Sequence, residues 1–116
     1  MSEPDVQEQR GVVVASEVGL TIRSMRDVMQ MVGAAYAAEG IVLTPDDVDA
    51  SFFDLRSGLA GELFQKVTAY GVRLALVVPD QAAYGPRWAD LAFEHANHRV
   101  IRFLPTRADA EAWIRS

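Results

Sequence analysis

Hydrophobic residues recur along the chain in two patterns. Short apolar runs, which are typical of strands buried in a sheet, occupy residues 12–15, 41–43, 72–78 and 100–104. Between these runs, apolar residues recur every three to four positions, which is the spacing of a helix with one buried face. This spacing predicts helices over 24–39, 57–70 and 86–97, and a closing helix that begins near 106.

The N-terminal part predicts a β-hairpin. Val6–Gln9 and the run at 12–15 flank Arg10-Gly11, a tight-turn pair. With the hairpin included, the element order is β-β-α-β-α-β-α-β-α. We therefore expect one α/β domain over 1–116, with a mostly parallel mixed sheet of about five strands, about four helices and a loose tail at 1–5.

Local signals mark the expected helix ends. Ser24–Asp27 and Thr106–Asp109 have the spacing of a capping box, in which a hydroxyl accepts from the third-residue N–H. Thr44–Asp47 combines a cap, a proline and two acids, which predicts another helix start. Gly40 and Gly71 follow apolar stripes in the position where glycine usually ends a helix.

Composition narrows the class of protein. Of the 116 residues, 50% are hydrophobic and 23% are charged, which favours a packed core over disorder. The chain has no cysteine, and this excludes disulfides, cysteine-ligated zinc and thiol catalysis. The first residues show no signal peptide and no apolar run reaches membrane length, so we expect a cytoplasmic protein.

Charge is unevenly distributed. The net charge of −5 disfavours nucleic acid and anionic membranes as partners. Residues 1–54 hold ten acidic and three basic side chains, whereas 55–116 hold six acidic and eight basic ones. These opposed halves favour either self-association or internal ion pairing, and the sequence does not separate the two.

One segment carries a specific resemblance. Phe52–Lys66 reads FFDLRSGLAGELFQK, and it is similar to the signature of the bacterial domain-of-unknown-function family 4180. Tyr70 with the strand from Arg73, and the closing Trp113-Ile114, also resemble that family. The resemblance implies no biochemical role, because none is assigned to the family. Residues of its motif are candidates for an interaction surface: Phe53, Asp54, Ser57, Gly58, Gly61 and Glu62.

A broader resemblance is to the STAS domain of anti-sigma-factor antagonists. It rests on the element order and on Asp54 followed by Ser57-Gly58-Leu59, with one residue more than the STAS motif has. In that class a serine of the motif is phosphorylated by a partner kinase, which makes Ser57 the candidate phosphoacceptor. The alternative for Ser57 is an ordinary helix cap, whose oxygen satisfies a backbone donor. The adjacent Phe52-Phe53 pair cannot both point inward, so we expect one ring to be exposed.

Three further groups were weighed as sites. Acidic side chains at 46, 47, 49 and 54 match no calcium-loop spacing, and helix-start roles explain them better than a metal does. His95 and His98 are the only histidines, and a solvated helix end explains them better than a ligand pair. Asp80, Tyr84 and Arg87 follow the strongest strand, where α/β sheets bind ligands, although Pro79-Asp80 is also a common turn pair.

Together these features predict a non-enzymatic regulatory or protein-interaction module with no metal and no cofactor. Its expected partner is a kinase-like or regulatory protein, or a second copy of the chain. The alternative is a small-ligand-binding domain or minor enzyme that uses the pocket after Val78. A third hypothesis is nucleic-acid binding through four arginines of the basic half: Arg87, Arg99, Arg102 and Arg107.

Overall fold

The protein has a parallel sheet with helices on both faces. The computed structural model describes residues 12–14, 21–35, 38, 40–80 and 83–116. Their strands lie in the order β1-β2-β3-β4, and every neighbouring pair is parallel. The strands are β1 (Val12–Val14), β2 (Gly40–Leu43), β3 (Arg73–Val77) and β4 (Ile101–Leu104).

Helices connect the successive strands, as parallel pairing requires, and one more helix, α6, follows the last strand. They are α2 (Met25–Ala35), α3 (Ala50–Phe53), α4 (Leu59–Tyr70), α5 (Pro86–Glu94) and α6 (Arg107–Ile114), with short 3₁₀ turns η2 (Pro45–Asp47) and η3 (Leu55–Ser57). Within the described residues, no helix has the length and apolar character needed to cross a membrane.

The expected sheet was wrong in strand number and in type. The described strands are four and wholly parallel, in place of a mixed sheet of about five strands opened by a hairpin. The second arm of that hairpin pairs in parallel with β2, in the register Val13 to Ile41, and its first arm, 6–9, lies outside the described residues. The described part of the chain holds five α-helices, which also exceeds the expected four or so. The likeness to STAS domains, which rested on the element order, is not confirmed.

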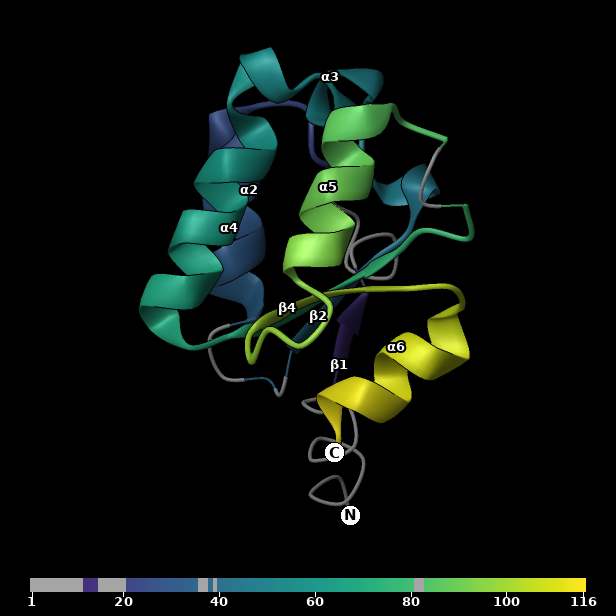
Figure 1. The fold of residues 1–116 in the computed structure, drawn as a ribbon. Coiled ribbons are helices and arrows are strands. Elements are labelled where there is room, and N and C mark those ends of the chain that lie inside the picture. The colour runs from purple at the N-terminus through teal and green to yellow at the C-terminus, as the bar shows by residue number, and fades with distance from the viewer. Residues whose placement is uncertain (1–11, 15–20, 36–37, 39, 81–82) are drawn as a thin grey trace.

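Alternation along each strand divides the core between two faces. Leu74, Leu76 and Phe103 belong to a large cluster packed with residues of α2, α4 and α5. Ala75 and Val77, the intervening residues of β3, pack instead with Ala110 and Ile114 of α6. Figure 1 shows the consequence, with α2, α4 and α5 on one side of the sheet and, of the described helices, only α6 on the other. Because both faces are covered, the strands are apolar on both sides.

Most of the expected helix ends are confirmed. Thr106 caps α6, because its side-chain oxygen accepts from the backbone N–H of Asp109 at 3.1 Å. Gly71 ends α4 with φ of 67°, a left-handed conformation that glycine adopts without strain. The helix start predicted at Thr44 is only the 3₁₀ turn η2, in which Thr44 and the buried Asp47 form a reciprocal capping box. These caps and turns determine the course of the loops that follow the strands.

Candidate functional site

The clearest groove lies where β2 and β3 lead into α3 and α5. Its volume is about 450 Å³. One wall comes from the segment after α3 and the other from the first turn of α5; the lining residues are Phe53, Asp54, Leu55, Arg56, Tyr84, Gly85, Pro86, Arg87 and Trp88. Both segments follow the carboxyl ends of parallel strands, which is the edge where α/β sheets bind ligands.

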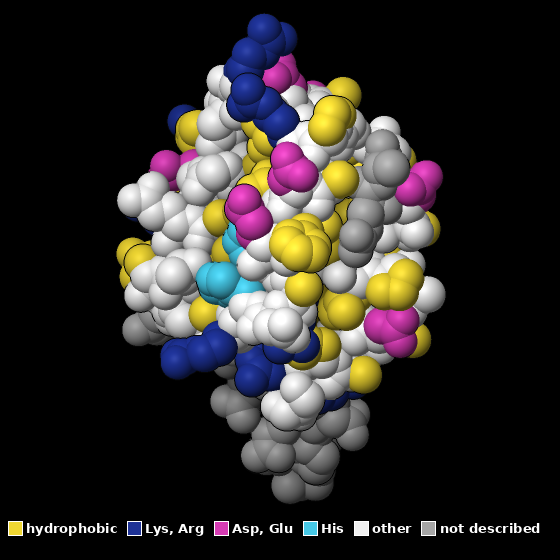
Figure 2. Space-filling view, in the orientation of Figure 1, with side chains coloured by type: hydrophobic (Ala, Val, Ile, Leu, Met, Phe, Trp, Pro, Cys, Tyr) yellow, Lys and Arg dark blue, Asp and Glu magenta, His cyan; other side chains and the backbone are white. Residues whose placement is uncertain are grey.

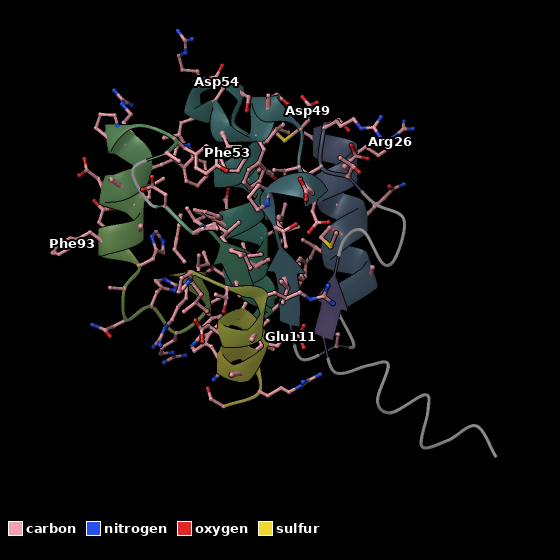
Figure 3. The ribbon with its side chains drawn as sticks, turned by 90° about the vertical axis from the view of Figure 1, so that its right-hand side faces the viewer. Arg26, Asp49, Phe53, Asp54, Phe93 and Glu111 are labelled. Atoms are coloured by element: carbon pink, nitrogen blue, oxygen red, sulfur yellow. The ribbon has the colours of Figure 1, made fainter. Side chains whose placement is uncertain are left out.

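Aromatic side chains hold the two walls together. The rings of Phe53 and Tyr84 stack with centroids 3.8 Å apart and planes 3° from parallel. Trp88 is buried beside them, and its indole N–H donates to the Phe53 carbonyl oxygen at 2.7 Å. Phe52 is fully buried against Trp88, and Phe53 is half-buried and also packs against the core, so the expectation that one of the two rings is exposed is not confirmed. Figure 3 shows the Phe53 side chain pointing toward α5, whereas the side chain of Phe93, which belongs to α5, points outward from the molecule.

The polar groups of the groove favour an anion. Gly85 is the N-cap of α5 with φ of 99°, and as a glycine it has no side chain to cap this helix; among the described residues no other side chain caps it. The first-turn N–H groups of Arg87 and Trp88 therefore belong to an uncapped positive helix end. Arg56 and Arg87 add two guanidinium groups; of the described residues that line this part of the groove only Asp54 is acidic, and the adjoining hollow adds Asp90 and Glu94. The Asp54 carboxylate accepts from the backbone N–H of Arg56 at 3.1 Å and so serves the local turn.

The groove continues between α4 and α5. A second hollow of about 490 Å³ shares Leu55 and Arg87 with the first, and it is lined further on by Gly61, Phe64 and Leu91, among others. Gly61 is exposed, and a Cβ added to it would meet no atom within 4 Å. Close packing therefore does not require a glycine at this position. The missing side chain widens the hollow.

Ser57 lies in η3, one residue before the N-cap of α4. That N-cap is Gly58, with φ of 81°. The Ser57 hydroxyl donates to the Ser51 carbonyl oxygen at 2.7 Å and accepts from the Leu59 N–H at 3.3 Å. The serine is exposed, and its oxygen connects α3 to the start of α4. Glu62, the last of the motif residues, forms an ion pair with Lys66 along α4 at 3.6 Å.

The pocket expected after Val78 is present in part. Tyr84 and Arg87 line the groove, and the motif residues Phe53 and Asp54 join them there. Asp80 is exposed and does not line it. The sequence analysis thus assigned to two separate sites residues that belong to one. It missed Trp88 and Arg56, since a tryptophan on a helical stripe indicates core and an arginine beside an acid indicates a solvated turn.

The acidic group has local structural roles. Asp47 accepts from the backbone N–H of Thr44 at the start of its own turn η2, and Asp49 is the N-cap of α3, where it accepts from both the N–H and the hydroxyl of Ser51. These hydrogen bonds, the backbone one first, lower the pKa of Asp49 below its ordinary value. Among the described residues, no three His, Asp or Glu side chains come together in a way that could hold a metal ion.

The two histidines have different partners. His95 donates from Nδ1 to the Leu91 carbonyl oxygen at 2.7 Å. His98 instead accepts at Nδ1 from the backbone N–H groups of Val100 and Ile101, both at 3.0 Å. Burial lowers the pKa of His98, and the charges of His95, Arg99 and Arg102 lower it further. His98 is therefore a neutral acceptor that shapes the turn into β4.

The arginines of the nucleic-acid hypothesis do not form one surface. Arg87 lies in the groove at the carboxyl edge of the sheet. Arg99 and Arg102 line a separate cavity beside the start of β4, at the amino edge. Arg107 pairs with Glu111 along α6, at 2.9 Å. The structure thus separates these charges between two edges of the sheet and one helix.

Comparison with known proteins identifies a family and nothing beyond it. No curated protein and no solved structure matches the chain. The family model that matches is described as a domain of unknown function, DUF4180, and the match covers residues 7–114. It thus includes both walls of the groove, the Phe52–Lys66 segment among them. The chain belongs to the DUF4180 family.

Proposed function

We propose that this protein is a binding domain for a small molecule with a flat apolar body and an anionic group. The groove at the carboxyl edge of the sheet is its site. The observation that carries the proposal is the juxtaposition of the stacked Phe53–Tyr84 pair with the uncapped first turn of α5. An aromatic wall recognises a flat apolar body by stacking, and a helix N-terminus with a guanidinium group recognises negative charge.

The lining residues favour binding over catalysis. Their only carboxylate, Asp54, accepts hydrogen bonds from the backbone and side chain of Arg56. The described residues of the lining include no histidine, serine or threonine to act as a base or nucleophile. In this proposal Arg87 pairs with the anionic group, Tyr84 and Phe53 contact the flat body, and Trp88 holds the two walls in place.

Matched probes test the proposal. We would titrate ¹⁵N-labelled protein with 2-naphthoate and with the neutral 2-naphthylmethanol, following the indole N–H signal of Trp88 and the amide signals of Gly85 and Arg87. We expect saturable shifts with the carboxylate and much weaker binding of the alcohol. Because hydrogen bonds to charged groups contribute about 1.5–3 kcal/mol, Arg87→Ala is expected to weaken carboxylate binding about tenfold or more.

The control is Arg26→Ala. Arg26 is equally exposed but lies on α2, away from the groove, as Figure 3 shows. This variant removes the same charge and should leave the affinity for 2-naphthoate within about twofold, because long-range charge effects are screened by salt. Equal affinity for the two probes, or equal losses in the two variants, would overturn the proposal.

A second proposal keeps the regulatory role, with Ser57 as a phosphorylated switch. The observation that favours it is that the exposed Ser57 hydroxyl bonds both to α3, which carries Phe53, and to α4. A phosphate ester can no longer donate to the Ser51 carbonyl oxygen, so it would loosen the wall of the groove. The partner would be a kinase-like protein. Intact-mass analysis of protein from its own host tests this, and phosphate absent from Ser57 under all growth conditions tried would contradict it.

A further inference from the structure

A second cavity, at the amino edge of the sheet, has a different chemistry. It measures about 420 Å³ and lies between the starts of β3 and β4 and the end of α6. Arg73, Arg99 and Arg102 all line it, together with Trp113. Among the described residues that line the cavity, none is acidic. Figure 2 shows Lys and Arg side chains gathered below the two histidines on this part of the surface.

Two of the three guanidinium groups are held in place. Arg73 donates from Nη1 to the carbonyl oxygens of Trp113 and Ile114, at 2.9 and 3.1 Å, and to Ser116. Arg102 donates from Nε to the His98 carbonyl oxygen at 3.0 Å. Both guanidinium carbons also lie near the Trp113 ring, at 5.3 and 5.2 Å from its centroid, within the range of cation–π attraction. The charges are therefore pre-positioned.

Part of this charge has a structural explanation and part does not. The end of α6 carries partial negative charge, and Arg73 neutralises it by binding the last carbonyls. Among the described contacts, neither Arg99 nor Arg102 binds the last carbonyls of α6, although the Arg102 guanidinium lies over the Trp113 ring, and no described acidic residue forms an ion pair with either arginine. Burial lowers the pKa of the adjacent His98 most, and the positive charges of His95, Arg99 and Arg102 lower it further. Solvent screens the exposed Arg99, but two guanidinium groups beside one cavity still attract an anion.

We infer that this cavity binds a small multivalent oxyanion, such as the phosphate or pyrophosphate group of a phosphorylated small molecule. Guanidinium groups present paired N–H donors that match two oxygens of a phosphate. Arg99 and Arg102 contact the anion, and Arg73 is a positioning residue. The inference is independent of the groove proposed above, which lies at the opposite edge of the sheet.

The two tryptophans allow a sharp test. Trp113 lines this cavity and Trp88 lines the groove, so their indole N–H signals report on the two sites separately. We would titrate ¹⁵N-labelled protein with inorganic phosphate and pyrophosphate at constant ionic strength. The expected result is a saturable shift of the Trp113 signal and of the Gly71 and Val100 amides, tighter with pyrophosphate, while the Trp88 signal stays unchanged.

Matched variants complete the experiment. Arg99 is exposed, and its removal should leave the fold intact. Because it removes one charged contact, Arg99→Ala should weaken pyrophosphate binding about tenfold. Arg99→Lys keeps the charge but not the paired donors, so its affinity should lie between those of the wild type and the alanine variant. Arg26→Ala is the control for net charge and should stay within about twofold. The inference is overturned if the shifts do not saturate, if both alanine variants lose affinity equally, or if only a single-stranded oligonucleotide moves the Trp113 signal.

Discussion

The two cavities of this molecule differ because they lie at opposite ends of parallel strands. The groove at the carboxyl edge is lined by loops and by the N-terminus of α5, and its walls are largely aromatic. The cavity at the amino edge is lined by strand starts and by the C-terminus of α6, and its walls carry three arginines. A parallel sheet thus provides two chemically distinct edges from one set of strands.

The two edges also differ in which charges are compensated within the described part of the protein and which are left to attract a ligand. At the carboxyl edge the positive end of α5 is left without a side-chain cap, so the helix itself provides an attraction for anions. At the amino edge the negative end of α6 is satisfied by Arg73, and it is the surplus arginines that attract anions. The groove therefore selects mainly by shape and stacking, whereas the cavity selects by charge.

The largest expected effect comes from the aromatic wall of the groove. Trp88→Ala removes a side chain that is 3% exposed and packs against Phe52, Phe53, Phe64 and Phe103. We expect a loss of about 3–5 kcal/mol in the free energy of unfolding, measured by urea denaturation. Phe93→Ala, at a ring that is 82% exposed on the same helix, should change it by less than about 0.5 kcal/mol. Similar losses in both variants would show that the wall is not part of the core.

A second pair of variants compares one substitution at the two edges. A Cβ on Gly40 would lie 2.8 Å from the Arg73 carbonyl oxygen and 2.8 Å from Ile114 Cγ2, where α6 meets the sheet. Gly40→Ala should therefore destabilise by about 1–3 kcal/mol through overpacking. Gly61→Ala, which meets nothing, should stabilise by about 0.5–1 kcal/mol, because alanine restricts the unfolded chain and favours the helix. Thermal unfolding followed by circular dichroism measures both, and effects of the same sign would contradict this contrast.

Sequence patterns predicted the local parts of this fold well. The capping box at Thr106 and the left-handed Gly71 depend on residues within one helical turn, and both are confirmed. The helix and strand positions from 24 onward are also mostly correct, since each depends on a periodic run. The sheet was wrong, because the hairpin prediction used a local turn signal, whereas β1 pairs with β2 some 28 residues away in sequence.

The residues of the groove could not be grouped into one site from the sequence, because contacts between distant segments bring them together. Phe53 and Trp88 are 35 residues apart, and nothing local indicates that the indole of one donates to the carbonyl of the other. The motif residues Phe53 and Asp54 and the loop residues Tyr84 and Arg87 were each identified from their own surroundings. Only the packing of α3 against α5 shows that they form one site. The arginine cavity was missed because its residues alternate with core positions along β3 and β4.

A smaller effect is expected at the connection between α3 and α4. Ser57→Ala removes the hydroxyl that donates to the Ser51 carbonyl oxygen and accepts from the Leu59 N–H. An exposed pair of such bonds predicts a loss of about 0.5–1.5 kcal/mol in the free energy of unfolding. Ser57→Thr keeps the hydroxyl and is the control. If the alanine variant binds 2-naphthoate as the wild type does, the Ser57 link does not shape the groove.

The smallest expected effect, a dependence of stability on pH, connects the fold to the arginine cavity. Protonated His98 cannot accept at Nδ1 from the Val100 and Ile101 N–H groups, and burial with nearby positive charge lowers the pKa of His98 below its ordinary 6.5. The folded protein therefore binds this proton less readily than the unfolded chain does. His98 contributes stability that is full above about pH 6.5 and is lost as the pH falls from there through the lowered pKa.

His98→Asn is the matched control, since the asparagine oxygen can accept from the same backbone groups without titrating. Urea unfolding of both proteins between pH 7.5 and 5, a range chosen about the ordinary pKa of histidine, should show the extra acid sensitivity only in the wild type. A bound oxyanion beside Arg99 and Arg102 would offset the positive charge that lowers the pKa of His98. Pyrophosphate should therefore raise that pKa toward its ordinary value and reduce the difference between the two proteins. If saturating pyrophosphate leaves the pH dependence unchanged, the anion does not bind beside these arginines. The inference that the amino-edge cavity selects its ligand by charge would then fail.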